Sequence, residues 1–386
     1  MSDINYYRGN FCVEIHPAPG SLVIFGASGD LAKRKLFPAL YHLFRRNLLH
    51  EESRIIGCAR TAYSDDAFRD HLRPFLPEGS EEQRVAFLAK IRYVAGDYSD
   101  PGFYRKLDGV LNTLEAANDL PSNRTFYLAM PASLYPAIID KLSESGMLEE
   151  SPEPDAPWRH VVLEKPFGRD FASAEELDRD LHSHMREDQI YRIDHYLGKD
   201  TVQNILMLRF ANLVFEPVWN SRYIDHIQLT AAETLGVENR AGYYEQAGLL
   251  RDMFQNHMLE MLSLAAMEMP ASFSPDDVRS EKVKLIKSIR PFDLKHLNET
   301  VVRGQYEGYR SEPGVAPDSR TETFVAAKLE IANWRWAGVP FYLRSGKKLA
   351  ARKSEIAIVF KSIPHSIFAP IRARDMQPDT LVLKVQ

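Results

Sequence analysis

Short apolar runs alternate with longer segments of helical period over the first half of this 386-residue chain, and this alternation restricts the fold more than any other feature. The apolar runs are SLVIF, RIIGCA, IRYVAGD, RTFYLAM and HVVLEKP, which begin at Ser21, Arg54, Ile91, Arg124 and His160. The helical segments are residues 31–50, 66–76, 103–117 and 134–145. Parallel strands are buried on both faces and form continuous apolar runs, and crossover helices join them. The alternation therefore predicts a Rossmann-type α/β domain, in which five parallel strands form a doubly wound sheet.

The pattern changes after about residue 200. Residues 199–210 and 249–267 have a helical pattern, residues 223–233 alternate as a strand does, and residues 273–317 are expected to be loop-rich. The later runs FVAAKLEI, PFYLRSG, EIAIVF and TLVLKV follow one another without long helices, as in antiparallel sheets. We therefore expect a second, α+β domain with a largely antiparallel sheet.

These changes divide the chain into three parts. We expect a loose N-terminal arm at residues 1–19, a dinucleotide-binding domain at residues 20–198, and an α+β domain for substrate binding and oligomerisation at residues 199–386. The chain ends at Gln386 directly after an apolar strand, so we expect the second domain to be incomplete at its C-terminus.

Composition excludes several classes of protein. Apolar residues make up 45% of the chain and charged residues 26%, ordinary values for a globular protein that rule out global disorder. The formal net charge of −5 does not favour nucleic acid as a partner. No apolar stretch approaches the length of about 18 residues that a membrane span needs. Cys12 and Cys58 are too few for a disulfide framework, which favours a cytoplasmic location.

The first apolar run ends in a glycine-containing turn, GASGDLA, that leads into a helical segment. Glycines at this position of a dinucleotide-binding fold allow a tight turn, so that backbone N–H groups and the helix N-terminus approach a pyrophosphate. The spacing is G-x-x-G-x-x-A, and an ordinary βα turn with glycines is the alternative. The candidate coenzyme-binding residues of this turn are Gly26, Ala27, Ser28, Gly29, Asp30, Leu31, Ala32 and Lys33.

The choice between NAD and NADP depends on the residue at the end of the second strand, where an acid binds the ribose 2′-hydroxyl and a base accepts a 2′-phosphate. In this chain that residue is Arg60. A guanidinium matches the geometry of a phosphate, so Arg60 predicts NADP as the coenzyme. The alternative is a solvated arginine at the end of a strand.

Three further strings, EKPFG at residues 164–168, RIDHYLGK at 192–199 and RDMFQNH at 251–257, follow GASGDLAKRK in this order. Through these four strings, the chain from about residue 20 to its end resembles the glucose-6-phosphate dehydrogenase family. The resemblance implies that glucose 6-phosphate is oxidised at C1 to 6-phosphoglucono-1,5-lactone with NADP as hydride acceptor, the first step of the oxidative pentose phosphate pathway. Members of the family usually continue beyond the point where this chain stops. No metal ion is expected in the reaction.

The string RIDHYLGK has the chemistry of a phosphate site. His195, Tyr196 and Lys199 bring an imidazole, a phenol and an ammonium within five residues, and together they can bind a phosphate dianion. A helix that begins near Leu197 would add its free N–H groups. The alternative is that Asp194 and His195 only cap this helix. The resemblance implies that the three residues line the phosphate end of the substrate site.

Loss of a hydride from C1 also requires the C1 hydroxyl to lose its proton, and an imidazole that titrates near neutral pH suits the role of general base. His257 is the candidate, although its spacing from Met253 and Leu250 also fits a hydrogen-bonded histidine on an apolar helix face. The resemblance implies the catalytic role and adds Asp194 as the carboxylate that orients the imidazole.

The remaining candidates rest on the resemblance. It implies that Glu233 and Asp252 accept hydrogen bonds from the sugar hydroxyls. On an ideal α-helix Asp252 and His257 are about 140° apart, so both reach one pocket only if the pocket wraps the helix end. The other implied substrate contacts are Lys165, Lys347, Arg352 and Gln386. Tyr127 and Lys165 are implied to contact the coenzyme.

Two other functions stay open at this point. A dehydrogenase of an unphosphorylated sugar also carries an E-K-P string after a Rossmann sheet, although the HYLGK cluster disfavours this reading. A catalytically silent or weakened binding subunit is the other, because an incomplete sheet can pair with another chain. In either case a homo-oligomer, a dimer or tetramer formed through the sheet of the second domain, is the expected assembly.

Overall fold

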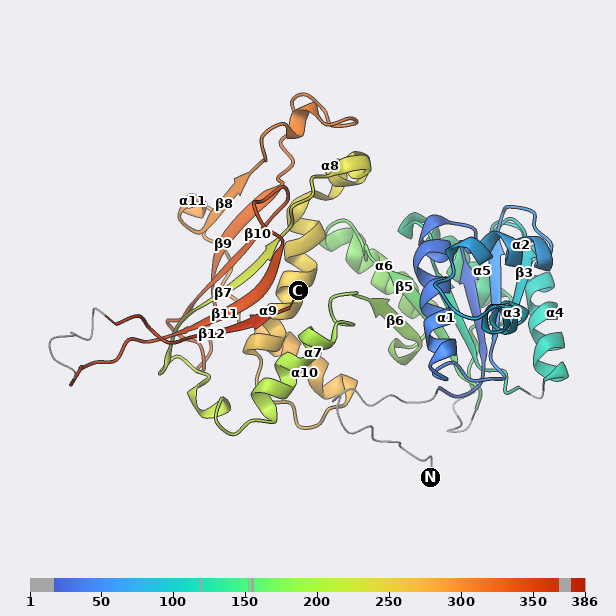
Figure 1. The fold of residues 1–386 in the computed structure, drawn as a ribbon, viewed down its shortest axis with the longest axis horizontal. Helices are drawn as coiled ribbons and strands as arrows, with labels where there is room; N and C mark the ends of the chain where they lie inside the picture. The colour runs from blue at the N-terminus through green and yellow to red at the C-terminus, as the bar shows by residue number, and fades with distance from the viewer. Residues whose placement is uncertain (1–16, 119, 152, 154–155, 368–375, 386) are drawn as a thin grey trace. The chain divides into compact units, whose positions relative to one another are not determined.

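The computed structural model describes residues 17–118, 120–151, 153, 156–367 and 376–385. The chain divides into two compact units, Met1–Ile193 and Asp194–Gln386 (Figure 1). Most of the arm expected at residues 1–19 lies outside the described residues, as does Cys12. Within the described part of the chain, no helix is long and apolar enough to cross a membrane.

The first unit contains a six-stranded parallel sheet in the order β3-β2-β1-β4-β5-β6. The strands are β1 (Ser21–Phe25), β2 (Arg54–Ala59), β3 (Ile91–Ala95), β4 (Arg124–Leu128), β5 (Arg159–Glu164) and β6 (Ile190–Ile193). This order is that of a Rossmann fold, so the predicted fold class is confirmed. The prediction of five strands was wrong, because the sixth strand, IYRI, is short and buries only its first residue.

Helices cover both faces of this sheet. They are a π-helical turn η1 (Ala32–Leu36), α1 (Phe37–Arg45), α2 (Asp65–Leu72), α3 (Glu81–Ala89), α4 (Pro101–Ala117), α5 (Tyr135–Glu144) and α6 (Phe171–His184). Three short 3-10 turns accompany them, η2 (Arg73–Phe75), η3 (Ala132–Leu134) and η4 (Glu187–Gln189). Ile24 of β1 packs in a core with α1, α2 and α3, whereas Val23 and Phe25 pack in a second core with α4 and α5.

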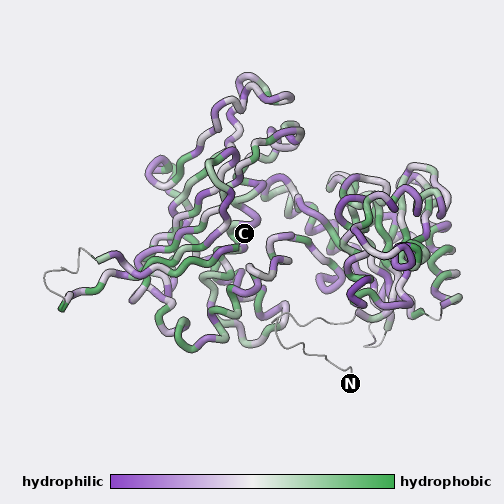
Figure 2. The backbone as a smooth tube through the Cα atoms, in the orientation of Figure 1, coloured by the Kyte–Doolittle hydropathy of each residue, from purple (hydrophilic) through white to green (hydrophobic). Residues whose placement is uncertain are grey.

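The second unit contains a six-stranded sheet in the order β12-β11-β7-β10-β9-β8. The strands are β7 (Ile224–Ala232), β8 (Val301–Gly304), β9 (Phe324–Glu330), β10 (Pro340–Gly346), β11 (Lys353–Phe360) and β12 (Thr380–Lys384). Only the β7–β10 pair is parallel, so the predicted, largely antiparallel sheet is confirmed. Buried and more exposed residues alternate along β9 and β10, and Figure 2 shows both hydrophobic and hydrophilic residues along the strands of this sheet.

The helices of the second unit are α7 (Asp200–Phe210), α8 (Ala241–Leu249), the π-helix η7 (Leu250–Met258), α9 (Leu259–Ala266), α10 (Pro275–Lys287) and α11 (Leu297–Thr300). Three 3-10 turns, η5 (Glu216–Val218), η6 (Glu238–Arg240) and η8 (Tyr309–Ser311), lie between them. The prediction of a loop-rich segment at 273–317 was wrong for α10. Ser274 caps this helix by accepting a 3.2 Å hydrogen bond from the Asp277 N–H, and Pro275 occupies the first helical turn, where proline is tolerated.

Candidate active site

In the first unit, the turn after β1 needs glycine for a steric reason. Gly26 has a φ of 79°, and a Cβ atom at this position would lie 2.4 Å from the carbonyl oxygen of Ala129. The Gly26 N–H donates to the Cys58 carbonyl and to the Tyr98 hydroxyl, both at 2.9 Å. Helical structure begins at Asp30, so the first N–H groups of that helix have no partner inside it. This turn can therefore bring backbone donors close to a phosphate.

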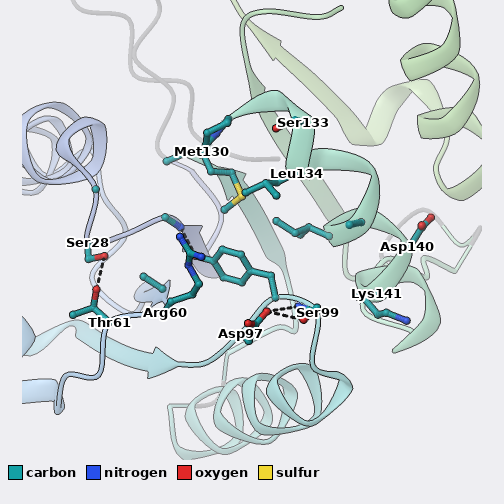
Figure 3. Close-up of a pocket in the computed structure, with 18 of the residues that line it drawn as sticks. Ser28, Arg60, Thr61, Asp97, Ser99, Met130, Ser133, Leu134, Asp140 and Lys141 are labelled. Atoms are coloured by element: carbon teal, nitrogen blue, oxygen red, sulfur yellow. Dashed lines mark hydrogen bonds between the residues drawn. The ribbon is translucent and has the colours of Figure 1, made fainter.

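A cavity of about 730 Å³ adjoins this turn (Figure 3). Its volume is in the range of small-molecule and cofactor sites. Of the predicted coenzyme residues, four line it: Gly26, Ser28, Gly29 and Arg60. In Figure 3, Ser28, Thr61 and Arg60 lie at one end of the cavity, and Asp140 and Lys141 lie at the other.

Several lining residues were missed by sequence reasoning. They follow β3 and β4 or belong to α5: Asp97, Tyr98, Ser99, Met130, Pro131, Ser133, Leu134, Ile138 and Lys141. Their position in the sequence, rather than their residue type, could have identified them as lining residues, because open α/β sheets bind ligands at the carboxyl ends of the strands. A search of the residues just after each predicted strand would have found the first half of this set.

Arg60 directly follows β2 and lies beside the Ser28–Thr61 hydroxyl pair, whose oxygens are 3.4 Å apart. The Ser99 N–H and hydroxyl hold the pKa of Asp97 below its ordinary value, and the positive charge of Arg60 adds to this effect. The guanidinium is therefore close enough to Asp97 to act on its charge. Arg60 occupies the position at the end of the second strand at which a side chain would bind a 2′-phosphate.

The other predicted coenzyme residues have different environments. Ala27 and Ala32 are buried, and Asp30 pairs with Lys33 at 2.9 Å, an interaction that lowers the pKa of Asp30. The described residues that line the cavity do not include Leu31, Tyr127 or Lys165. Tyr127 donates a 2.5 Å hydrogen bond to Glu164 Oε1, and Lys165, directly after β5, joins Pro166 through a cis peptide bond. Their contacts with a coenzyme stay predictions.

In the second unit, His257 lies against Asp194. The two atoms in contact are His257 Nδ1 and Asp194 Oδ1, at 2.7 Å, and the side chain of His257 is only 1% exposed. Asp194 Oδ1 also accepts a 2.9 Å hydrogen bond from the Tyr196 N–H. Burial acts to raise the pKa of Asp194, but the hydrogen bond and charge of His257, with the Tyr196 N–H, outweigh burial and lower it. The structure therefore brings together the two residues predicted as base and orienting carboxylate.

The residues of the predicted phosphate cluster pack around the same histidine. The ring of Tyr196 stacks on His257 with centroids 4.1 Å apart, and the ring of His195 meets His257 edge-on at 4.5 Å. Lys199 Nζ lies 3.8 Å from the centroid of the Tyr196 ring. Burial lowers the pKa of Lys199, and the positive charge of Arg352 lowers it further. Two cations are thus held close enough to repel each other, an arrangement that a bound dianion would stabilise.

The helix that follows RIDHYLGK begins later than predicted, at Asp200 rather than near Leu197. Its N-cap residue is Lys199, which makes no side-chain capping bond. The alternative that Asp194 and His195 cap this helix is therefore wrong, because the Asp194 carboxylate instead accepts from Tyr196 and contacts His257. The Asp194 carboxylate therefore contacts the imidazole of His257 instead of capping the helix.

Glu233, Asp252 and Lys347 form a third group. Lys347 Nζ pairs with Glu233 and lies 4.0 Å from Asp252 Oδ2. The backbone supports this arrangement, because the Glu233 N–H donates to the Gly346 carbonyl at 2.9 Å. Tyr243 was missed by sequence reasoning, and its hydroxyl donates to Asp252 Oδ1 at 3.3 Å. Three predicted substrate residues are therefore brought together by charge pairing.

The helix geometry differs from the ideal α-helix assumed for Asp252 and His257. Residues Leu250–Met258 form a π-helix, and at its end the Leu259 N–H bonds to the Phe254 carbonyl, five residues back. The wider i→i+5 turn brings residues five apart toward one face, so the predicted separation of about 140° does not apply. Asp252 and His257 are both buried, at 5% and 1% exposure.

The structure says less about two of the predicted substrate contacts, Arg352 and Gln386. Arg352 acts electrostatically on both Lys199 and Tyr196, so it belongs to the phosphate cluster. Gln386 lies outside the described residues. Ser354, which sequence reasoning missed, hydrogen-bonds the hydroxyl of Tyr196, although burial is the larger influence and raises the pKa of that tyrosine.

The chain is similar to known proteins over nearly its full length. The family model "Glucose-6-phosphate dehydrogenase, NAD binding domain" matches residues 23–204, and "Glucose-6-phosphate dehydrogenase, C-terminal domain" matches residues 206–386. Glucose-6-phosphate 1-dehydrogenase from Bacillus subtilis (strain 168) is 43% identical over 375 residues, which cover 95% of this chain and 76% of the relative. The Rhizobium meliloti (strain 1021) enzyme is 44% identical over 384 residues, 95% of this chain and 75% of the relative.

Solved structures agree with these matches. A glucose-6-phosphate dehydrogenase in complex with its substrate glucose-6-phosphate has a TM-score of 0.87 at 37% identity, over 96% of this chain and 76% of that chain. Glucose-6-phosphate 1-dehydrogenase from Mycobacterium avium has a TM-score of 0.84 at 38% identity, over 96% of this chain and 78% of that chain. The chain thus belongs to the glucose-6-phosphate dehydrogenase family.

Proposed function

We propose that this chain is an oxidoreductase that converts glucose 6-phosphate to 6-phosphoglucono-1,5-lactone, with transfer of a hydride from C1 to NADP. This is the first step of the oxidative pentose phosphate pathway. The observation that carries the proposal is the His257–Asp194 pair, packed directly against His195 and Tyr196 of the predicted phosphate cluster. A base beside a phosphate-binding group is what a sugar-phosphate dehydrogenase requires.

The phosphate of the substrate would be bound by His195, Tyr196, Lys199 and Arg352. The ammonium and the guanidinium supply positive charge, and the imidazole and phenol supply hydrogen-bond donors. The mutual repulsion of Lys199 and Arg352 falls when a dianion binds, so substrate binding is favoured over the empty state. An unphosphorylated sugar lacks this gain.

The sugar hydroxyls would be oriented by Glu233 and Asp252. Each carboxylate contacts Lys347, and these contacts limit the positions of the two hydrogen-bond acceptors. Tyr243 fixes the second carboxylate through Asp252 Oδ1. This support serves catalysis, because a sugar ring held by two acceptors presents C1 in one orientation.

Proton removal would be performed by His257. Asp194 contacts Nδ1, so Nε2 is the nitrogen that takes the proton from the C1 hydroxyl. As the O–H bond breaks, a C=O bond forms, and the C1–H bond breaks with its electron pair leaving as hydride. A bound nicotinamide supplies the electron sink for that hydride. The ionised Asp194 stabilises the imidazolium that results.

The coenzyme would bind at the turn after β1. The positive φ of Gly26 and the closeness of Ala129 leave no space for a side chain, which fits close approach of a pyrophosphate. Arg60 supports the choice of NADP over NAD, since its guanidinium matches a 2′-phosphate. Tyr127 and Lys165 belong to this proposal as further coenzyme contacts.

We assign coenzyme binding to residues 20–198 and substrate binding with assembly to residues 199–386, with the segment from Asp194 onward also serving the substrate. A homo-oligomer in the cytoplasm completes the proposal. Its support is the face of the second sheet that carries exposed Tyr342 and Arg344 on β10, because an uncovered sheet face suits contact with a second copy. Sedimentation of the chain and of a Tyr342→Asp variant tests this assembly.

Turnover of glucose 6-phosphate and of glucose, followed by the absorbance of the reduced coenzyme, tests the proposed function. Oxidation of the phosphorylated sugar at least tenfold faster than of glucose is the expected result. Equal rates would favour a dehydrogenase of unphosphorylated sugars. No reaction with either sugar, with NADP still bound, would favour a catalytically silent subunit.

A further inference from the structure

The start of the π-helix η7 is held by a residue from another element, Glu322, which lies two residues before β9. Glu322 Oε1 accepts a 3.0 Å hydrogen bond from the Leu250 N–H. Its backbone carbonyl accepts a second 3.0 Å hydrogen bond, from the Leu249 N–H. The first N–H groups of a helix lack partners inside it, so Glu322 satisfies two of the donors at the point where η7 begins.

The backbone at this junction is shaped to receive the carboxylate. Gly248, the last residue before the two donors, has φ 65° and ψ 174°, a conformation that other residues rarely adopt. A Cβ atom on Gly248 would lie 2.5 Å from Glu322 Oε1. The glycine thus allows both the change of direction into η7 and the close approach of the Glu322 side chain.

The residue after Glu322 holds a second element of the same site. The Thr323 carbonyl accepts a 2.9 Å hydrogen bond from the Lys347 N–H, and the Thr323 N–H donates to the Gly304 carbonyl at 2.9 Å. Thr323 is fully buried. Two consecutive residues therefore fix the start of the helix that carries Asp252 and His257, and the backbone of the lysine that pairs with Glu233.

We propose that Glu322 is a positioning residue for the reaction. Its carboxylate sets the start of η7, and the π-helical turn that follows brings Asp252 and His257 to one face, where they act on the substrate. The kinetic consequences of this inference rest on the proposed function. The capping of η7 by Glu322 does not depend on that function. Loss of the carboxylate leaves the Leu250 donor without its acceptor and releases the turn toward an ordinary α-helix, in which Asp252 and His257 diverge.

The test compares Glu322→Ala, Glu322→Gln and the control Glu330→Ala. Glu330 is an exposed glutamate of the same strand β9, pairs with Arg290 at 3.5 Å, and is not among the described residues that line the cavity beside η7. Glu322→Ala is expected to lower kcat for glucose 6-phosphate oxidation by about 10- to 100-fold, with KM for NADP within about twofold of wild type. Glu322→Gln keeps an oxygen acceptor, so it is expected to restore kcat to within about threefold. The control is expected to match wild type.

A second readout does not depend on activity. Amide hydrogen exchange of residues 249–258 is expected to speed up at least tenfold in Glu322→Ala and to stay near the wild-type rate in Glu322→Gln. Unchanged amide exchange in Glu322→Ala would overturn the inference, whether or not the wild-type chain oxidises glucose 6-phosphate. Failure of the wild-type chain to oxidise glucose 6-phosphate would count against the proposed function alone. Glu322→Gln as impaired as Glu322→Ala in kcat would also overturn it.

Gly248→Ala keeps the test decisive if Glu322→Ala fails to fold. The added methyl group would clash with Glu322 Oε1, and alanine rarely adopts the positive φ of this position. The substitution therefore displaces the Glu322 carboxylate without changing Glu322 itself. We expect Gly248→Ala to reduce kcat by about 10- to 100-fold and to speed up exchange of the same amides. Wild-type kcat and exchange in this variant would contradict the inference.

Discussion

Nδ1 of His257 lies 2.7 Å from Oδ1 of Asp194, although the two residues are 63 positions apart in the sequence. The carboxylate comes from the first residue of the second unit, and the imidazole comes from the π-helix η7. Because Nδ1 is directed at the carboxylate, the proposed mechanism assigns proton acceptance to Nε2. This orientation is the basis of the first prediction.

Asp194→Asn is expected to reduce kcat about 100-fold or more. The amide keeps the shape of the carboxylate but carries no charge, so it neither selects the required tautomer nor stabilises the imidazolium. Steady-state kinetics with glucose 6-phosphate measures this effect. Asp225→Asn, a change to an exposed carboxylate beside His226, is a matched control that should leave kcat near the wild-type value. A kcat in Asp194→Asn equal to that of the control would refute the role of Asp194.

The stability of the chain should also depend on Asp194 in a defined direction of pH. Despite burial, the hydrogen bond and charge of His257 hold the pKa of Asp194 below its ordinary value. A carboxyl with a lowered folded pKa stabilises the fold above its unfolded pKa of about 3.9, and this contribution is lost as pH falls through the folded pKa. Urea unfolding should therefore show wild type more stable than Asp194→Asn at about pH 7, with the difference shrinking toward about pH 2. The same difference at both pH values would argue against a stabilising interaction between Asp194 and His257.

Lys199→Gln and Arg352→Gln test the phosphate cluster. Each variant is expected to raise KM for glucose 6-phosphate by about 10- to 100-fold, because each removes a charge-assisted hydrogen bond to the dianion. KM for NADP should not change. Lys353→Gln, which removes a neighbouring cation that pairs with Glu355 at 2.7 Å, is the control. If Lys353→Gln raised KM as much as Arg352→Gln, the effect would be one of general surface charge.

Arg60→Ala tests the choice of coenzyme. Loss of the guanidinium is expected to raise KM for NADP about tenfold or more and to leave KM for NAD within about twofold, since only NADP carries the 2′-phosphate. Arg92→Ala serves as a control, because Arg92 pairs with Asp65 at 3.0 Å and is not among the described lining residues of the cavity. An unchanged ratio of the two KM values in Arg60→Ala would show that another group selects the coenzyme.

Local pattern was sufficient for most of the fold. The first five strands are apolar runs bounded by polar segments, so periodicity alone located them. β6 was missed because Tyr191 and Arg192 interrupt a strand of four residues, and α10 was missed because it lies in a longer segment punctuated by Lys and Pro. β6 forms through its parallel pairing with β5, whereas α10 has local start signals, Ser274 as N-cap and Pro275 in the first turn, that hydrophobic period does not report.

The site was predictable to a different extent. Asp194, His195, Tyr196 and His257 were named from side-chain chemistry and resemblance, and the structure brings them together. The π-helical turn that carries Asp252 was not predictable, since it depends on a contact with Glu322, far along the chain. Hydrophobic period cannot report such a contact, because it reflects only which face of an element is buried.

Replacement of His257 by Asn tests the central claim most directly. The amide occupies a similar volume but does not accept a proton near neutral pH, so kcat for oxidation of glucose 6-phosphate should fall by at least about 100-fold. Coenzyme binding, measured by fluorescence titration with NADPH, should stay within about twofold of wild type because the cavity proposed for the coenzyme is lined by residues of the first unit. A kcat close to that of wild type, in a variant that binds coenzyme normally, would contradict His257 as the general base.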